Sequence, residues 1–588
     1  MQTIRMTNLR VSSGRAAIAL ALGLALRAGA AQAVIDMGQL GARSGDGSDT
    51  SPVVARALEQ CKVAGAKKIL FPRGVYEFWP DRAAEEYLFA SNNDPGLKRI
   101  AFPIRDLENI EIDGQGSTFI FHGGISAFVV ERSRGVTLKN FSIDWKRPFH
   151  NEARILAVTE SGIDLEISGQ FPYKVQKGLL YFLDENGGSC GKRNRDACPV
   201  GDLLEFDSQK RETAYMVRDY YSAPYVPASV IAPGRVRIVQ PGLKVTAGNT
   251  LVFGMTNRDY PAMTLTDSSS IKVESVTIHH AGGMGILAQR CRDMELDHVK
   301  VTPSPGRMIS VPADATHFVN CAGRIVMSHC LFENQLDDAT NIHGIYAQVT
   351  RLLSPAEIEV KLVHPQQRGV GFVAAGDPVE FVHADSLISF AQARAKSVVR
   401  VNGEYTRIAM EGPPAQELRP GDAVASTAGY PDVVIRNSTI RNNRARGLLL
   451  GSRGKILIED NTFHTPGAAI LMEGDARYWF EQAGVRDLTI RRNSFDNCNY
   501  GVWGKAVIEV AAGIEPALRD QSRYNRNIVI EENVFRVFDQ TRLVLAYSVD
   551  GLIVRNNRIE RTSAYPARKE DYPPFDITNS DRVNITGK

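Results

Sequence analysis

The chain has 588 residues, with 69 Lys and Arg against 66 Asp and Glu, which gives a formal net charge of +3. Four of the arginines and no acidic residue lie in residues 1–33, so the remainder carries a formal charge of −1. This near-neutral balance argues against nucleic acid or an anionic membrane surface as the main partner. The length exceeds that of one compact core, so we expect several domains or one repetitive domain.

Residues 1–33 have the pattern of a signal peptide. Arg5, Arg10 and Arg15 form a basic start, residues 16–26 are apolar, and residues 31–33 read Ala-Gln-Ala, a small-residue cleavage site. The apolar run is well short of the roughly 20 residues that span a bilayer. We therefore expect an exported protein, periplasmic or secreted, with no membrane anchor, and residues 1–33 to lie outside the fold.

Residues 45–76 predict a helix followed by a strand. A polar run at 45–50 precedes an amphipathic run at 53–64, and an apolar segment with a Pro-Arg-Gly turn follows at 68–76. The segment resembles the N-terminal cap of pectin-lyase-like right-handed β-helices. A solenoid needs such a cap, because its first coil otherwise exposes core residues.

An octad of alternating apolar residues then recurs along the chain. It begins at Val136, Ile271, Met294, Ile325, Val433, Ile456, Leu488, Ile528 and Leu552. Alternation with a period of two predicts strands with one buried face and argues against helices, whose period is 3.6. Intervals of 23 or 24 residues suit one coil of three short strands, and the intervals of 31, 32 and 40 carry extra loop residues.

Asparagine recurs at one position of this octad. The residues are Asn461, Asn493, Asn533 and Asn557. Asparagine tolerates the left-handed backbone of a tight turn, and stacked asparagine side chains hydrogen-bond along a solenoid. We expect both properties here.

Two intervals between octads are too long for coils, and both are rich in turns and alternating residues. We predict that each is a small antiparallel β-barrel inserted through a loop. The predicted fold is all-β, a right-handed parallel β-helix with two inserted barrels. The predicted divisions are 1–33 signal peptide, 34–145 cap and first coils, 146–262 first barrel, 263–344 coils with acidic residues, 345–430 second barrel, and 431–588 C-terminal coils.

A short acidic phrase occurs twice. Asp314-Ala-Thr recurs 24 residues later as Asp338-Ala-Thr, and Asp337 directly precedes the second copy. An interval of one coil places the two phrases side by side, with the backbones of the aspartates roughly 5 to 8 Å apart. That range overlaps the carboxyl separations of retaining glycosidases, about 5–5.5 Å, and of inverting ones, about 6.5–9.5 Å. Spacing therefore does not choose between the two mechanisms.

The residues around these aspartates are polar where other coils are apolar. In our alignment of coils, the position of Asp314 and Asp338 is occupied elsewhere by Met284, Arg446 and Tyr500. Polar side chains concentrated in an apolar repeat indicate a site, because buried polar groups cost free energy unless they are partnered. Clustered carboxylates repel, so at least one keeps a proton near neutral pH, as acid–base glycoside hydrolysis requires. We predict that Asp314, Asp337 and Asp338 are catalytic.

Further polar and aromatic residues on the same face are predicted to bind substrate. They are Thr316, His317, Thr340, Asn341, His343, Arg444, Arg446, Glu473, Asp475, Tyr478 and Trp479. Tyr478 and Trp479 suit the apolar C–H face of a sugar ring, although ordinary packing of loop aromatics explains them equally well. We predict no metal and no cofactor, since no His-x-His or His-x-x-x-His pair occurs.

Seven cysteines are present. Cys190 and Cys198 bracket a polar loop, and we predict a disulfide between them in an oxidising compartment. Cys291 and Cys321 are predicted to stack on adjacent coils, either as a disulfide or as buried thiols. The absence of a Cys-x-x-Cys pair argues against a zinc ribbon.

Four phrases resemble glycoside hydrolase family 110, which comprises bacterial exo-α-1,3-galactosidases. They are residues 140–149 (NFSIDWKRPF), 313–318 (ADATHF), 336–344 (LDDATNIHG) and 474–480 (GDARYWF). The resemblance implies release of terminal galactose from blood-group-B-type or linear galactosides, without a metal and with inversion. It also implies that the acidic cluster is Asp314, Asp337 and Asp338. The residues do not fix each role; we assign Asp337 as the proton donor and the other two to the attacking water.

Two other readings fit a β-helix with clustered aspartates. A polygalacturonase-like hydrolase would act on a polyanion and would carry Lys and Arg along the cleft, including an Arg-x-Lys near the end of the helix. The chain has Arg444 and Arg446 but no Arg-Ile-Lys. A carbohydrate-binding adhesin or tailspike-type β-helix would bind a glycan without cleaving it. Oligomeric state is not determined by the sequence.

Overall fold

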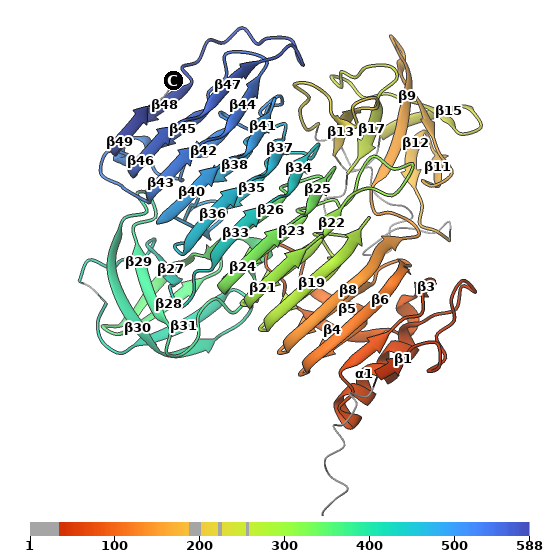
Figure 1. The fold of residues 1–588 in the computed structure, drawn as a ribbon, viewed down its shortest axis with the longest axis horizontal. Helices are drawn as coiled ribbons and strands as arrows, with labels where there is room; N and C mark the ends of the chain where they lie inside the picture. Colours follow the sequence, from red (N-terminus) through yellow and green to blue (C-terminus); the bar gives the residue numbers. More distant parts are fainter. Residues whose placement is uncertain (1–33, 187–201, 221–225, 255–257, 415, 587–588) are drawn as a thin grey trace, which may run out of the picture.

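The computed structural model describes residues 34–186, 202–220, 226–254, 258–414 and 416–586. These residues form a parallel β-helix with an N-terminal helix and two antiparallel insertions (Figure 1). The predicted signal peptide and the predicted Cys190–Cys198 pair lie outside the described residues. Among the described residues, no helix combines the length and the apolar character needed to cross a membrane.

The predicted N-terminal helix is present as α1 (Ser51–Ala64). It starts with a proline in its first turn and ends at Gly65, whose left-handed backbone (φ 69°) terminates the helix. Val54, Ala57 and Leu58 are buried and belong to the main core of the β-helix. The helix therefore closes the N-terminal end of the solenoid, beside β1 in Figure 1.

The larger parallel sheet forms two of the sides of the coils. Its strands are β1 (Val34–Asp36), β2 (Lys68–Leu70), β3 (Val75–Phe78), β6 (Glu108–Phe121), β8 (Arg134–Trp145), β19 (Ser269–Ile278), β21 (Arg292–Asp297), β22 (Lys300–Val301), β24 (Ala322–Ser328), β25 (Leu331–Glu333), β33 (Asp432–Arg436), β34 (Thr439–Arg441), β36 (Lys455–Glu459), β37 (Thr462–His464), β40 (Asp487–Arg491), β41 (Ser494–Asp496), β43 (Asn525–Glu531), β44 (Val534–Val537), β46 (Val549–Arg555), β47 (Arg558–Arg561) and β49 (Asp581–Thr586).

The other sheet forms the remaining side. Its strands are β4 (Ala84–Leu88), β5 (Gly96–Arg105), β7 (Ser126–Glu131), β18 (Met263–Thr266), β20 (Ile286–Gln289), β23 (Thr316–Val319), β26 (Thr340–Ile345), β35 (Leu448–Leu450), β38 (Ile470–Met472), β42 (Ile508–Val510), β45 (Val544–Tyr547) and β48 (Phe575–Thr578), and β39 (Glu481–Gln482) pairs with β26. We call this sheet the site sheet.

The octad register is confirmed. Every octad start pairs with the next in the larger sheet, from Val136 with Ile271 through to Ile528 with Leu552. The same register extends to Ile110 and Val583, which the octad search missed. Ile110 and the nine octad starts therefore point into one continuous core, whereas Val583 on the last coil is 38% exposed.

The asparagine stack is also present. The backbone N–H groups of Asn461 and Asn493 each donate to the side-chain oxygen of the next asparagine, at 3.0 Å and 2.9 Å, and the stack continues to Asn557. The left-handed backbone, however, falls one residue earlier, for example at Asp460 and Arg492. The predicted hydrogen bonds are confirmed, and the predicted backbone conformation belongs to the preceding residue.

The first insertion is an antiparallel sheet between β8 and β18. Its strands are β9 (Asn151–Thr159), β10 (Gly162–Ile167), β11 (Tyr173–Gln176), β12 (Leu179–Phe182), β13 (Leu203–Asp207), β14 (Glu212–Thr213), β15 (Val226–Ala232), β16 (Arg235–Ile238) and β17 (Thr250–Phe253). It returns to the C-terminal coils, where Thr213 contacts Tyr500 and Glu212 accepts a hydrogen bond from Tyr565.

The second insertion is a closed antiparallel barrel. Its strands are β27 (Ala347–Ser354), β28 (Glu357–Lys361), β29 (Pro378–Val382), β30 (Ser389–Arg400), β31 (Tyr405–Met410) and β32 (Ala423–Ser426). Barrel residues such as Val349 and Ile358 share a core with Leu287 and Val319, which point outward from the site sheet. The barrel therefore covers part of the outer face of that sheet.

Cys291 and Cys321 are free and buried, which matches the buried-thiol alternative of the sequence analysis.

Candidate active site

The acidic residues are brought together by the register of the site sheet. Thr316 of β23 pairs with Thr340 of β26, which pairs with Leu448 of β35. Asp314 and Asp338 each lie two residues before the first residue of their strand, and their backbones stack, since the Ala315 N–H donates to the Asp338 carbonyl at 3.0 Å.

The three aspartates form a compact cluster. Each offers a carboxylate oxygen within 4.8 Å of an oxygen of the other two. Asp314 and Asp338 are each 3% exposed. Three carboxyl groups this close cannot all ionise without strong counter-charges.

Arginines supply those counter-charges. Arg258 contacts Asp337 at 2.5 Å and Arg444 contacts it at 3.3 Å. Arg446 binds Asp338 twice, through its backbone N–H at 3.0 Å and through Nη2 at 2.9 Å. The cluster is therefore an alternating arrangement of carboxylates and guanidinium groups.

These surroundings raise two of the three pKa values and lower the third. Burial and the neighbouring Asp337 raise the pKa of Asp314 to about 8. Burial likewise raises the pKa of Asp338 to about 8, with Arg446 opposing the rise. Burial alone would raise the pKa of Asp337 too, but its arginine neighbours outweigh it and lower the value. Near neutral pH the cluster thus contains both protonated and ionised carboxyl groups.

Two histidines extend the cluster behind Asp314. His317 Nδ1 lies 2.6 Å from Asp314 Oδ2, and His317 Nε2 lies 2.8 Å from His343 Nε2. His343 Nδ1 lies 2.6 Å from the Gly344 carbonyl oxygen. Burial and the neighbouring His343 lower the pKa of His317 well below its ordinary value, so this imidazole is neutral.

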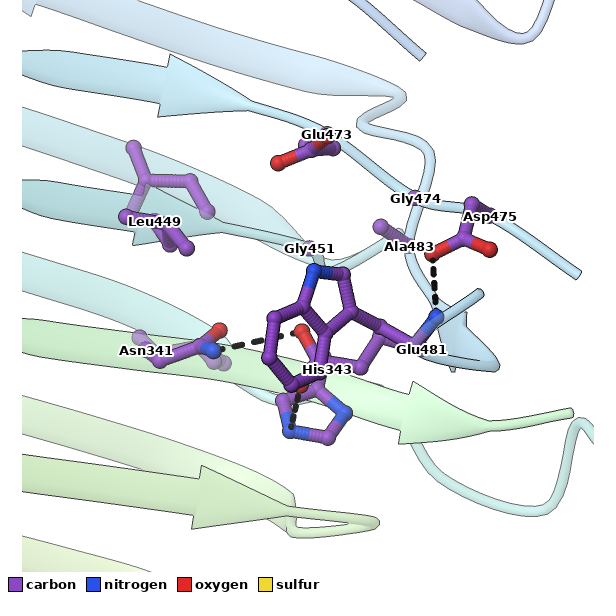
Figure 2. A pocket seen from close by; sticks show the side chains of 12 residues that line it. Asn341, His343, Leu449, Gly451, Glu473, Gly474, Asp475, Glu481 and Ala483 are labelled. Atoms are coloured by element: carbon purple, nitrogen blue, oxygen red, sulfur yellow. Dashed lines mark hydrogen bonds and ion pairs between the residues drawn. The ribbon is translucent and has the colours of Figure 1, made fainter. Parts of the chain in front are cut away.

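A small pocket with polar side chains in its lining lies beside the cluster. Its lining includes Asn341, His343, Glu473, Asp475, Trp479 and Glu481 (Figure 2). Figure 2 shows Asn341 and His343 converging on Glu481, which accepts from Asn341 Nδ2 at 3.2 Å and lies 3.5 Å from His343 Nε2. The outer face of β26 therefore supplies one wall of the pocket.

The opposite wall is the loop after β38. Asp475 accepts backbone N–H bonds from Arg477, Tyr478 and Trp479 at 2.8, 2.5 and 3.0 Å. Trp479 lines the pocket and its ring lies 5.1 Å from that of His364, whereas Tyr478 is 73% exposed and does not line the pocket. Glu473 is exposed at the pocket, and desolvation by the surrounding protein raises its pKa to about 7.

Comparisons with known proteins identify the relatives. The chain is 36% identical to "Alpha-1,3-galactosidase A" of Shewanella woodyi, over 99% of this chain and 95% of the relative. It is 32% identical to "Alpha-1,3-galactosidase B" of Phocaeicola vulgatus, over 96% of each chain. The corresponding protein of Akkermansia muciniphila is 31% identical over 90% of this chain, which spans 66% of that longer relative.

The chain belongs to the α-1,3-galactosidase family of glycoside hydrolases.

This is the family that the four sequence phrases predicted, glycoside hydrolase family 110. Residues 151–251 match "GLAA-B beta-barrel domain I", residues 357–424 match "GLAA-B beta-barrel domain II", and residues 424–568 match "Right handed beta helix region". The predicted right-handed β-helix with two inserted barrels is therefore the fold of this galactosidase-family chain.

The fold brings most of the predicted site residues to one place. Asp314, Asp337, Asp338, His317, Asn341, His343, Arg444, Arg446, Glu473, Asp475 and Trp479 lie in the cluster or line the pocket. Thr316 and Thr340 do not. Their hydroxyl groups hydrogen-bond to each other inside the coil, and Thr316 also donates to the Ala339 carbonyl at 3.1 Å. A strand alternates its faces, so these threonines point inward where His317 points outward.

The alignment that included Tyr500 is wrong at that residue. Ile470 of β38 pairs with Ile508 of β42, so Ala506 occupies the position equivalent to Asp338. Tyr500 instead lies in the loop before β42, stacked on Tyr565.

Sequence reasoning missed several residues of the site. Arg258 follows the first insertion and Asp219 lies within it, so neither carries a coil pattern. Glu481 sits on β39 and accepts a hydrogen bond from Asn92 Nδ2 at 2.8 Å. The polar run from 473 to 481 contains Glu481 and was the one signal that pointed toward it.

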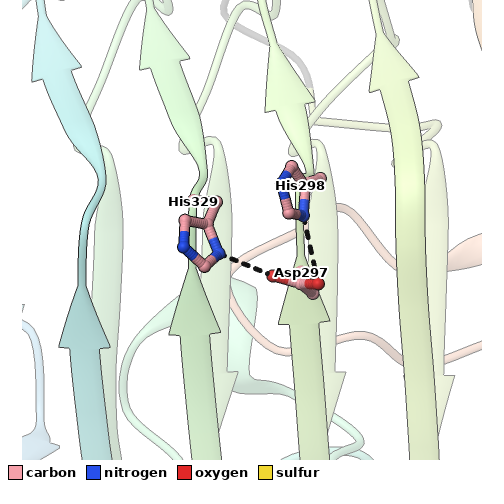
Figure 3. A group of neighbouring side chains, drawn as sticks. All are labelled: Asp297, His298 and His329. Carbon is pink, nitrogen blue, oxygen red and sulfur yellow. Dashed lines mark hydrogen bonds and ion pairs between the residues drawn. The ribbon is translucent and has the colours of Figure 1, made fainter.

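A separate group of titratable side chains lies on the larger sheet. Asp297 accepts from His329 Nδ1 at 3.0 Å and lies 3.1 Å from His298 Nδ1 (Figure 3). Burial alone would raise the pKa of Asp297, but hydrogen bonds from His329, Ser328 and His298 together outweigh it and lower the pKa to about 2. Both histidines are about half exposed, so this group is a surface ion pair on adjacent coils.

Proposed function

We propose that this glycoside hydrolase is an exo-acting α-1,3-galactosidase that removes terminal α-1,3-linked galactose from blood-group-B-type or linear galactosides. Family membership supports the linkage, because the relatives are named α-1,3-galactosidases. The observation that carries the proposal is the buried cluster of Asp314, Asp337 and Asp338 beside a polar pocket.

The proposed catalysts are the three aspartates. Glycoside hydrolysis needs one carboxylic acid to protonate the leaving oxygen and one carboxylate to activate water. The divergent pKa values of the cluster supply both forms at neutral pH. Asp337 as the proton donor remains a prediction, and its two arginine contacts count against it because they favour the ionised form in the free enzyme.

Exo action is part of the proposal through the family resemblance, and the pocket offers groups that suit a sugar ring. Asn341, Glu473 and Glu481 offer hydrogen-bonding groups for sugar hydroxyls, and Trp479 offers an aromatic surface.

Inversion at the anomeric carbon is part of the proposal through the family resemblance. The nearest carboxylate oxygens lie within 4.8 Å of one another, which is shorter than the separation of about 6.5–9.5 Å typical of inverting enzymes. The distance therefore does not favour inversion, and the anomer of the product is the decisive measurement.

We also propose that the reaction needs no metal ion. The guanidinium groups of Arg258, Arg444 and Arg446 already contact the cluster and balance its charge. Activity should therefore survive prolonged dialysis against a chelator. Export by residues 1–33 is likewise proposed, from the basic and apolar pattern of that segment.

One experiment tests linkage, activity and anomeric outcome together. The enzyme is mixed with a B-type trisaccharide and with the linear α-1,3-galactobiose, and the released sugar is followed by proton NMR. We expect β-galactose to appear first and then to equilibrate with the α-anomer. Early α-galactose would contradict inversion, and no release from either substrate would contradict the proposed function.

A further inference from the structure

Asp314, His317 and His343 form an unbroken hydrogen-bonded chain that ends on a backbone carbonyl. The three bonds run from Asp314 Oδ2 to His317 Nδ1 (2.6 Å), from His317 Nε2 to His343 Nε2 (2.8 Å), and from His343 Nδ1 to the Gly344 oxygen (2.6 Å). All three side chains are at most 4% exposed. Each bond must contain one hydrogen, because two facing lone pairs repel.

The carbonyl at the end fixes the direction of this chain. A carbonyl oxygen only accepts, so His343 Nδ1 carries a hydrogen. If His343 is neutral, its Nε2 is a lone pair and accepts from His317 Nε2. If His317 is neutral as well, its Nδ1 accepts, and Asp314 is the donor. The resting chain is then a protonated Asp314 followed by two neutral imidazoles.

Other placements of the same three hydrogens keep the same total charge. Moving one hydrogen from Asp314 to His317 gives a carboxylate beside an imidazolium, and moving the next one as well leaves the positive charge on His343. Every permitted arrangement is neutral overall. The chain thus transmits a proton by successive short shifts, with no rotation of a side chain.

Glu481 stands at the far end of the chain. Its Oε1 lies 3.5 Å from His343 Nε2, and it accepts from Asn92 and Asn341 at 2.8 and 3.2 Å. Burial opposes ionisation of Glu481, but in the arrangements that place positive charge on His343 or His317 that charge and the hydrogen bonds from these amides outweigh burial and lower its pKa. An ionised Glu481 stabilises a positive charge on His343.

We propose that His317, His343 and Glu481 form a proton relay behind Asp314; the proposal rests on the catalytic role of Asp314 proposed above. When the attacking water gives a proton to Asp314 Oδ1, the proton on Oδ2 moves to His317 Nδ1, and the proton on His317 Nε2 moves to His343 Nε2. Asp314 and His317 end neutral, and His343 becomes an imidazolium that faces Glu481. The reverse sequence returns the proton through Asp314.

The relay explains how a carboxyl group that is protonated at rest accepts a proton. His317 and His343 are positioning residues in this scheme, since they act through Asp314. Besides the chain itself, several charged groups face Asp314 from neighbouring elements. They are Arg258, Asp337, Asp338, Arg446 and Glu481.

The first test observes the protons directly and does not need activity. The chain has 11 histidines, and ¹⁵N-histidine labelling of the intact enzyme reports which ring nitrogen of each carries hydrogen. We expect His343 to be protonated at Nδ1 and His317 at Nε2 at neutral pH, with assignments from His317→Gln and His343→Gln. A resting His317 protonated at Nδ1 alone, or at both nitrogens, would overturn the relay.

The second test uses the pH dependence of turnover. In His317→Ala, Asp314 must ionise before it accepts a proton, so we expect kcat to fall about 100-fold and the acidic limb of kcat/KM to move toward about pH 8. Added imidazole should restore part of kcat, and KM should change little. A loss of activity without the shift and without rescue would show a merely structural role and would contradict the relay.

His280→Ala is the matched control. His280 is fully buried. Its Nδ1 lies 2.5 Å from the Ser310 carbonyl oxygen, and its Nε2 accepts a hydrogen bond from the Phe149 N–H at 2.9 Å. Neither partner belongs to the acidic cluster. We expect no shift of the pH profile and no imidazole rescue in this variant. If the wild type releases no galactose, the proposed function fails, and the labelling experiment still decides the proton arrangement.

Discussion

Asp219 of the first insertion binds the guanidinium of Arg444 through both carboxylate oxygens, at 3.0 Å to Nε and 2.6 Å to Nη2. The indole N–H of Trp503 also donates to Asp219, at 3.0 Å. Arg444 in turn contacts Asp337 at 3.3 Å. The insertion therefore orients an arginine of the acidic cluster from outside the β-helix.

Replacing Asp219 tests that link. Asp219→Asn leaves one side-chain oxygen and removes the charge, so Arg444 loses a bidentate partner. We expect about a tenfold fall in kcat with little change in KM, measured on an α-1,3-galactoside. Asp164→Asn is the control, because Asp164 makes the same bidentate contact with Arg237 on the far part of the insertion. Equal losses in both variants would mean that the insertion is only destabilised.

Asparagine substitution of each cluster aspartate tests the acid and base roles. We expect Asp314→Asn, Asp337→Asn and Asp338→Asn each to lower kcat on the natural disaccharide by at least about 100-fold. An activated aryl leaving group needs no proton, so the variant that lacks the donor should regain turnover on a dinitrophenyl α-galactoside. Only one of the three should do so. Recovery in none, or in all three, would contradict a division of roles within the cluster.

The repeat could be predicted because each coil buries its own apolar side chains. An octad has period two and must keep its register, so the pairing of Val136 with Ile271 follows from the sequence even across the first insertion. The same reasoning placed Asp314 beside Asp338, since both stand two residues before aligned strands. Local patterns of this kind persist from coil to coil.

The parts of the site that depend on insertions could not be predicted in this way. Arg258 and Asp219 reach the cluster only after a long excursion of the chain, and no periodicity relates them to Asp337. Thr316 was predicted to bind substrate because it is polar and close to Asp314. Side chains alternate between the two faces of β23, however, and Thr316 points into the coil. Polarity alone identified the coil, whereas strand parity decides which polar residue faces the pocket.

Trp479 is predicted to form the sugar platform. It lines the pocket and is 43% exposed, whereas its neighbour Tyr478 does not line the pocket. In Trp479→Ala we expect KM to rise about tenfold, which corresponds to roughly 1.4 kcal/mol of lost stacking, with kcat nearly unchanged. Tyr478→Ala serves as the control and should retain the wild-type KM. A larger rise in KM for Tyr478→Ala than for Trp479→Ala would show that Tyr478, not Trp479, forms the platform.

The asparagine stack should contribute strongly to stability. Asn493 Nδ2 donates to the Asn533 side chain and to the Ile458 carbonyl, at 3.0 and 2.9 Å, and its own Oδ1 accepts from Asn461. Asn493→Ala leaves several buried groups unpaired, so we expect a loss of about 2–4 kcal/mol, seen as a lower melting temperature. Asn584→Ala, on an exposed strand position of β49, should have little effect.

The buried carboxyl groups should make stability fall as pH rises. The pKa of Asp314 is about 8 in the folded protein, against about 3.9 for an unfolded aspartate. Between these values the unfolded chain releases a proton that the folded chain retains, so the free energy of unfolding decreases with pH. Asp314→Asn cannot ionise, yet its amide still donates to His317. We expect its melting temperature to match the wild type near pH 4 and to exceed it near pH 8, with about 1.4 kcal/mol gained for each pKa unit of the shift. A variant that is less stable by the same amount at both pH values would show that Asp314 is ionised in the folded enzyme.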